Sequence, residues 1–242
     1  MTQPENVIDC ACVIHGNAYD WTYVERLHSM LTRNLSPLII RLHVWTEANR
    51  DVPAHMVKHV LEDWPGIAGP RKAWWYKLQM FNRKHFEGRL LYFDLDTVIV
   101  DRLDWILALN PAFFWCIRDF KYLWRPTWEG MNSSVMYWNN ADFPTVWKQF
   151  KGENIQSVSR RFAGDQDFLT AAIDPTRRRF FDNSAVQSYR WQVKDGGMNM
   201  RTREYSSPNS GATVAPDTKI IIFHGQPKPH EVLDPKIQQH WK

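Results

Sequence analysis

An amphipathic helix between two apolar strands opens the chain, and this order limits the possible folds more than any other feature of the sequence. Residues 7–14 (VIDCACVI) are predicted to form a short buried strand. Apolar residues then recur at helical spacing over 21–35, and residues 39–45 read as a second strand. A strand, a helix and a strand in succession predict an α/β fold with a mostly parallel sheet flanked by helices.

Further elements continue this pattern. The chain has 242 residues and no Gly-, Ser- or Pro-rich linker, so one domain is predicted. In a helix predicted over 72–83, Trp74, Leu78 and Phe81 are expected to lie along one side. The other predicted elements are a helix over 162–173, strands over 89–93, 113–117, 134–138 and 219–223, a loop over 65–70 and a long polar loop over 194–216.

Composition excludes several classes of protein. The net charge is +4 without a long basic run, which argues against nucleic-acid binding and is compatible with a small anionic ligand. No apolar run reaches the roughly 18 residues of a membrane-spanning helix, and no secretory signal is recognisable. The three cysteines cannot form a disulfide framework, and Cys10 and Cys12 are too close to pair. A reducing, cytoplasmic location is therefore expected.

Two acidic residues, Asp94 and Asp96, directly follow the strand predicted over 89–93. In an extended backbone, residues two apart point the same way. Mg²⁺ or Mn²⁺ typically takes one or two such carboxylates and completes its shell with water and phosphate oxygens. Open α/β sheets also bind their ligands beyond the carboxyl ends of the strands. The alternative is a pair of solvated acids in a turn.

A second candidate group follows the last predicted strand, where His224, Gly225 and Lys228 occur in the run IIIFHGQPKP. A neutral imidazole can complete a metal shell. Glycine allows a close backbone approach, and lysine offers a point charge to a phosphate. A strand-end histidine in an ordinary turn is the alternative interpretation.

Other candidates have simpler alternatives. Asp165 and Gln166 open a helix, where acidic residues also serve as caps, although a carboxylate and an amide there could contact a ligand. Asn132 and Ser133 precede a strand and could belong to a polar turn. Lys77 on the helix before the third strand could be an ordinary solvated lysine.

Five segments occur in an order that resembles a known family. They are YKLQMF, LLYFDLDTVIVDRLDWIL, MNSSVMYWN, GDQDFLT and FHGQPKP. Together they resemble the family-eight nucleotide-sugar glycosyltransferases of the glycogenin and galactosyltransferase type, which have a single GT-A domain. The resemblance implies a metal-dependent, hexosyltransferase-like and retaining enzyme. Its donor would be a UDP-sugar, and its acceptor a glycan, a lipid or a protein.

The resemblance implies a metal and diphosphate site. Asp94, Asp96 and His224 match the ligands of Mn²⁺ (or Mg²⁺), and Asp94 also matches a donor contact. Lys228 and Gly225 match residues at the donor diphosphate. His224 and Gly225 are adjacent here, whereas the family usually has two residues between them.

On the sugar side, the resemblance matches Lys77, Asn132 and Ser133 to donor contacts. It matches Asp165 and Gln166 to the pair beside the reacting carbon, and residues 13–19 to the nucleobase wall. Residues 1–100 would then form a nucleotide-binding half, and residues 101–242 the half that binds the acceptor and completes the metal site. Most of the thirteen tryptophans are expected in the core, with others at a ligand mouth, because flat apolar faces suit sugar rings.

Two other functions fit parts of the sequence. A haloacid-dehalogenase-type phosphatase also has Asp-x-Asp after an apolar strand, and Asp94 would be its nucleophile. That motif normally opens the chain, however, and here a β-α-β unit precedes it. A non-catalytic nucleotide-sugar-binding protein is the second alternative.

Overall fold

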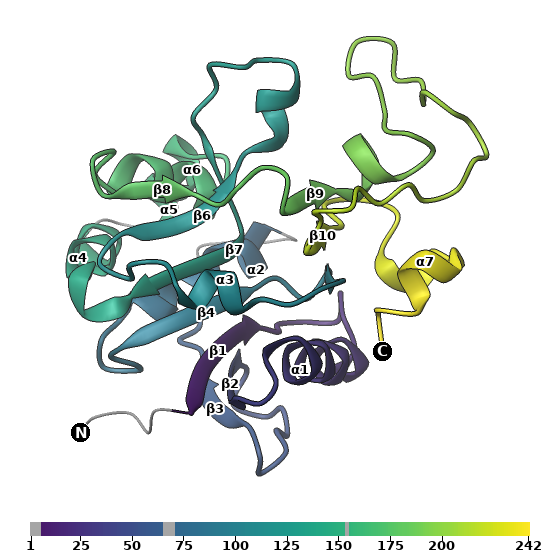
Figure 1. Ribbon diagram of the computed structural model, residues 1–242. Coiled ribbons are helices and arrows are strands. Elements are labelled where there is room, and N and C mark those ends of the chain that lie inside the picture. Colours follow the sequence, from purple (N-terminus) through teal and green to yellow (C-terminus); the bar gives the residue numbers. More distant parts are fainter. Residues whose placement is uncertain (1–5, 65–70, 153–154) are drawn as a thin grey trace.

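A seven-stranded sheet runs through the computed structural model, which describes residues 6–64, 71–152 and 155–242 (Figure 1). Its strand order is β3-β2-β1-β4-β7-β6-β8. A smaller sheet has the order β5-β10-β9. The strands are β1 Val7–Val13, β2 Ile39–Thr46, β3 Val57–Val60, β4 Arg89–Phe93, β5 Thr97–Ile99, β6 Phe114–Arg118, β7 Met131–Asn139, β8 Arg178–Phe180, β9 Val186–Ser188 and β10 Ile220–Ile222.

Strand direction in the large sheet agrees with the mostly parallel fold that the sequence predicts. β1 pairs in parallel with β2 and β4, β2 with β3, and β6 with β8. In this described sheet only β7 runs against its neighbours, β4 and β6. The predicted strand at 89–93 and the helix at 21–35 have the expected bounds, as β4 and as α1 (Trp21–Leu35). The mixed α/β class is therefore confirmed.

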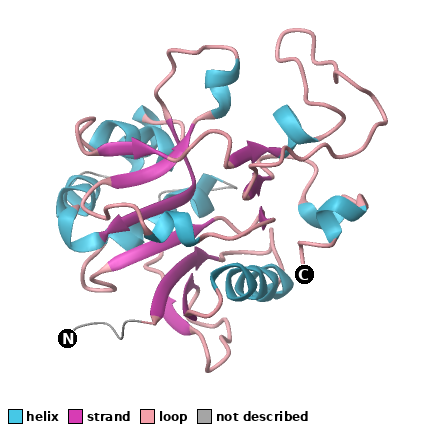
Figure 2. Ribbon diagram, viewed as in Figure 1, coloured by secondary structure: helices cyan, strands magenta, loops and turns pink. Residues whose placement is uncertain are grey.

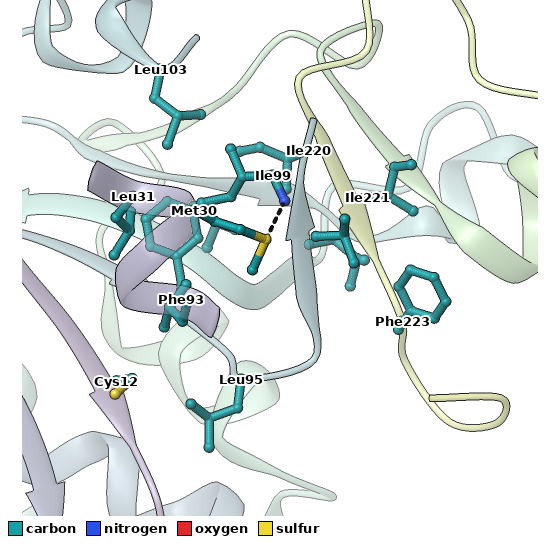
Figure 3. Close-up of a cluster of buried hydrophobic side chains, with 14 of the residues drawn as sticks. Cys12, Met30, Leu31, Phe93, Leu95, Ile99, Leu103, Ile220, Ile221 and Phe223 are labelled. Atoms are coloured by element: carbon teal, nitrogen blue, oxygen red, sulfur yellow. Dashed lines mark hydrogen bonds between the residues drawn. The ribbon is translucent and has the colours of Figure 1, made fainter. Parts of the chain in front are cut away.

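Both faces of the large sheet are buried, as is typical of parallel sheets. Successive side chains of a strand point to opposite faces, so Cys10 and Cys12 belong to the core beneath α1, whereas Ala11 belongs to the other core. The first core also joins the two sheets: Met30 of α1 accepts a hydrogen bond from the Ile99 amide (3.3 Å) beside Phe93 and Ile220 (Figure 3). The second core lies under helices of the opposite face.

The remaining helices are short, and several lie beside the second core (Figures 1 and 2). Four of these described helices, α3, α4, α5 and α7, were not predicted, and the helix predicted over 162–173 is shorter than expected, as α6. The helices are α2 Arg71–Tyr76, α3 Asp104–Leu107, α4 Pro144–Gly152, α5 Ile155–Arg161, α6 Asp165–Ala172 and α7 Pro235–Gln238.

The largest difference from the sequence prediction concerns the helix expected over 72–83. It forms as α2, followed by a 3₁₀ turn over Lys77–Phe81. A 3₁₀ turn has about three residues per turn instead of 3.6, so residues beyond Tyr76 rotate relative to the expected face. Leu78 and Phe81 are fully buried, but Trp74 is 47% exposed. The prediction that these three residues share one side was wrong.

The long loop predicted over 194–216 is confirmed as mostly irregular (Figure 2). Two isolated bridges, Lys194 with Ala212 and Met198 with Tyr205, fold it back on itself. The loop predicted over 65–70 lies outside the described residues. All three cysteines are free and buried. Across the described ranges, no helix combines the length and apolar character needed to cross a membrane.

Candidate active site

A cavity of about 990 Å³ opens at the carboxyl ends of β1 and β4. This is where open α/β sheets place their ligands. Residues from the loop after β1, the 3₁₀ turn, β7, α6 and the loop after β10 line it. All the residues singled out from the sequence contribute to its walls: Lys77, Asp94, Asp96, Asn132, Ser133, Asp165, Gln166, His224, Gly225 and Lys228. The fold thus brings these candidates together, and their individual roles stay predictions.

Lys77 is the centre of a buried charged network. Its Nζ lies 2.9 Å from Asp94 Oδ1 and 3.4 Å from Asp165 Oδ2, and it donates to Ser133 Oγ at 3.1 Å. Ser133 in turn donates to Asp165 Oδ2 at 2.5 Å. Burial lowers the pKa of Lys77, but Asp165 and Asp94 outweigh burial and raise it. Lys77 is therefore a fixed cation and not the solvated lysine of the alternative interpretation.

Asp165 opens α6 and is 4% exposed. Burial raises the pKa of this carboxyl, while Lys77 and Ser133 act in the opposite direction. Its side chain points into a network and does not serve as a simple helix cap. Tyr92 donates to Asp94 Oδ1 at 2.6 Å, which adds a hydroxyl to the same network.

Asp96 lies in a second group of polar side chains. Lys228 Nζ contacts its Oδ2 at 2.5 Å, and the Tyr19 hydroxyl donates to the same oxygen at 2.9 Å. Burial and the nearby charge of Asp94 raise the pKa of Asp96. Within the described ranges, Oδ1 of Asp96 has no hydrogen-bond partner. One oxygen of a buried carboxylate is thus available to a ligand.

His224 follows β10 and reaches the same cavity. Its Nε2 is hydrogen bonded to Ser188 Oγ at 2.6 Å, and its ring stacks on Phe120. Burial, and then Arg190, lower the pKa of this imidazole to about 4, so it is neutral near pH 7. In the part of the chain that the structure describes, no three His, Cys, Asp or Glu side chains are grouped as metal ligands. The expected set of three protein ligands is thus not assembled, because the ring nitrogen of His224 is turned to β9.

The loop after β10 depends on Gly225, which has φ +79°. This left-handed conformation strains any residue with a Cβ, and a Cβ there would also lie 3.4 Å from the Arg190 guanidinium. Arg190 donates to the Gln226 carbonyl and fixes the turn from the other side. The turn directs Lys228 to Asp96.

A clamp outside the cavity holds the loop that follows β1. Glu47 Oε1 accepts from the Gly16 amide at 2.5 Å, and Arg50 donates to the Gly16 carbonyl at 2.7 Å. Arg50 also donates to Glu47 Oε2 at 3.0 Å. Both backbone groups of Gly16, which has φ +67°, are thereby satisfied. Sequence analysis missed this pair because it acts through the backbone of a distant turn.

We expect Glu47→Gln to lower the free energy of unfolding by about 1–2 kcal/mol at neutral pH, because the clamp loses charge-assisted hydrogen bonds. Burial raises the pKa of Glu47, but Arg50 and the Gly16 amide outweigh burial and lower it to about 2. A depressed carboxyl pKa stabilises the fold above the unfolded value of 4.5, and this contribution is lost as the pH falls toward 2. The gap between wild type and variant should therefore close across that window.

Urea unfolding across this pH range measures the effect. Glu25→Gln is the matched control, because Glu25 is an exposed glutamate of α1. A gap between wild type and Glu47→Gln that stayed constant down to the acid end of the window would contradict the clamp.

Neither a family model nor a curated protein matches the sequence, whereas solved structures match its fold. The galactosyltransferase LgtC, in complex with donor and acceptor sugar analogs, superposes with a TM-score of 0.65 at 14% identity over 96% of this chain and 94% of that one. The glycosyltransferase GlyE of Streptococcus pneumoniae TIGR4 gives 0.62 at 12% identity, over 97% of this chain and 60% of that one. Mouse xyloside xylosyltransferase 1 gives 0.52 at 14% identity, over 90% of this chain and 98% of that one. The chain therefore has the GT-A fold that the sequence resemblance implies.

Proposed function

We propose that this protein is a metal-dependent glycosyltransferase that transfers a sugar from a nucleoside-diphosphate sugar to an acceptor. One observation carries the proposal. The cavity at the carboxyl ends of β1 and β4 joins paired carboxylates, two lysines and the N-terminus of α6. Carboxylates that share a site with fixed cations suit a metal diphosphate, and the fold is one that glycosyltransferases use.

Asp94 and Asp96 fit a divalent metal such as Mn²⁺ or Mg²⁺. They supply hard oxygen ligands two residues apart, and Oδ1 of Asp96 has no partner among the described residues. His224 would join them as a third ligand once its ring turns away from Ser188, to which Nε2 is now hydrogen bonded. Bound there, the metal would supply Lewis-acid stabilisation of the leaving diphosphate.

The donor would be bound by side chains and backbone groups of this chain. In this proposal residues 13–19 hold the nucleobase, which we take to be uracil, and Lys228 with Gly225 binds the diphosphate. Residues 1–100 thus supply most of the nucleotide site. Lys77, Asn132 and Ser133 face the donor sugar, and Lys77 holds the Asp165 carboxylate in place.

The chemical step exchanges one bond at the anomeric carbon. The bond from that carbon to the diphosphate oxygen breaks, and a bond to the acceptor hydroxyl oxygen forms. The hydroxyl proton leaves with the released diphosphate. Asp165 and Gln166 would lie beside the reacting carbon and stabilise its oxocarbenium-like charge, with retention of configuration.

A thermal-shift screen tests the proposal. With Mn²⁺ present, a UDP-sugar at about 100 times its Kd should stabilise the fold by about 2.7 kcal/mol and raise the Tm by roughly 5–10 °C. The shift should be smaller with metal omitted and EDTA added. GDP- and ADP-sugars serve as controls for the nucleobase. If no nucleotide sugar moves the Tm in Mn²⁺, the proposal fails.

The two alternatives have distinct outcomes. A phosphatase of the haloacid-dehalogenase type would carry a phosphoryl group on Asp94 after trapping, which intact-mass analysis detects. The fold does not favour a phosphatase of this type, because β1, α1, β2 and β3 all precede β4 and the acids that follow it, whereas the phosphatase motif normally opens the chain. A non-catalytic binding protein would show the Tm shift without any hydrolysis of the donor.

A further inference from the structure

Trp74 is exposed at the wall of the cavity, although its neighbours Trp75 and Tyr76 are buried. The change from α2 to the 3₁₀ turn at Lys77 separates it from the buried face. An indole that is 47% exposed leaves a large apolar surface in water, which carries a free-energy cost unless a ligand covers it. The position of this ring in the cavity points to a binding role.

The ring lies at the Asp165 end of the charged network. A Cβ added to Gly164, the residue before Asp165, would be 3.5 Å from Trp74 Cε3. The indole therefore packs close to the backbone that begins α6. Asp96, Tyr19 and Lys228 mark the diphosphate end of the same cavity.

Free polar groups accompany the ring. Gln166 and Asp167 also line the cavity. Their side chains form no hydrogen bond with any residue that the structure describes. A flat apolar face beside a free amide and a free carboxylate suits a pyranose, whose C–H face is apolar and whose edge carries hydroxyls. An alkyl chain would bury both polar groups without partners, which is unfavourable.

The cavity is also large. Its volume of about 990 Å³ is at the upper end of the roughly 300–1,000 Å³ of single small-molecule sites. We propose that Trp74, Gln166 and Asp167 form a subsite for a sugar ring of the acceptor. The acceptor is then a carbohydrate and not a lipid or a protein side chain. This inference rests on the proposed glycosyltransferase function.

Direct binding measurements test the subsite without requiring turnover. A panel of methyl hexopyranosides and pentopyranosides is screened by saturation-transfer NMR against wild type, Trp74→Ala, Trp74→Phe and the control Trp128→Ala. Trp128 is a half-buried tryptophan that does not line the cavity. The best glycoside should bind about tenfold more weakly to Trp74→Ala, which corresponds to about 1.4 kcal/mol, whereas Trp74→Phe should retain most of the affinity.

The nucleotide serves as the second readout. The Kd for UDP with Mn²⁺ should change less than about twofold in Trp74→Ala, since the ring is assigned to the acceptor. Equal glycoside binding by wild type and Trp74→Ala would overturn the subsite, as would a loss of UDP affinity as large as the loss for the glycoside. A wild type that binds UDP-sugar but only alkyl chains or peptides as acceptors would overturn it too. Absence of UDP-sugar binding would instead contradict the proposed function, while the glycoside assay would still test Trp74.

Discussion

Replacing Lys77 with Met should lower the free energy of unfolding by about 3–5 kcal/mol, the usual cost of removing one partner of a buried ion pair. Methionine preserves the length of the side chain and removes its charge. Asp165, whose side chain is 6% exposed, and Asp94 would then lie near each other without the cation that lies between them. Because proteins unfold at a cost of only about 5–15 kcal/mol, this is a large share of the total stability.

A double variant shows whether charge is the cause. Asp165→Asn keeps the shape of the side chain and its hydrogen bond with Ser133 while it removes one of the two carboxylates. In urea unfolding, Lys77→Met with Asp165→Asn should lose clearly less stability than the sum of the single variants, because the two residues interact directly. Lys84→Met, at an exposed position on the same segment, should stay within about 0.5 kcal/mol of wild type. Strict additivity would contradict the network.

Local sequence patterns predicted the first half of the sheet well. The bounds of four elements are close to those expected, because each has a clear apolar pattern and turn residues at its ends: β1, α1, β2 and β4. β3, β8 and β9 are three or four residues long, and β8 and β9 pair with strands that are far away in the chain. A strand of that length has no periodicity of its own and exists only because a neighbouring strand supplies its hydrogen bonds.

The site could be predicted as a set of residues but not as a set of contacts. The order of five segments identified part of the cavity lining, although it missed Trp74. The partners of each side chain depend on tertiary structure: Lys77 bridges β4 and α6, and His224 meets Ser188 because β9 pairs with β10. Tyr92 is the exception, since it precedes Asp94 by two residues at the end of β4, where the alternation of an extended backbone places both side chains on one side.

Trp74 shows the opposite case, in which a regular pattern was misleading. Helical spacing grouped it with Leu78 and Phe81, and the 3₁₀ turn at Lys77 separates it from them. The same turn brings Lys77 to Asp94 and Asp165. An irregular segment at a functional site is a common place for local rules to fail, because the backbone there serves the ligand as well as the core.

Replacing Asp96 with Ala should lower the kcat of metal-dependent donor hydrolysis by about 10²–10³ fold, because Asp96 is proposed to hold the metal that stabilises the leaving diphosphate. The fold should tolerate the change far better than the loss of Lys77. Burial and the charge of Asp94 raise the pKa of Asp96, which means that the structure holds this carboxylate at a cost. Its removal relieves that cost, while Lys228, whose side chain is 21% exposed, can turn to solvent.

Calorimetric titration of two substitutions separates a metal role of Asp96 from a structural one. Calorimetric titration of Mn²⁺ with UDP should show weaker binding in both Asp96→Ala and Asp96→Asn, because the amide preserves the shape but supplies a poorer metal ligand. Asp101→Ala is the matched control, since Asp101 follows β5 and pairs with Lys219 at the surface. If Asp96→Asn bound Mn²⁺ and UDP like the wild type, Asp96 would be only an anchor for Lys228 and Tyr19. Asp96 has a raised pKa and a side chain fixed by Lys228 and Tyr19. If Asp96→Ala loses activity but keeps its stability, Asp96 is retained for ligand binding and not for folding.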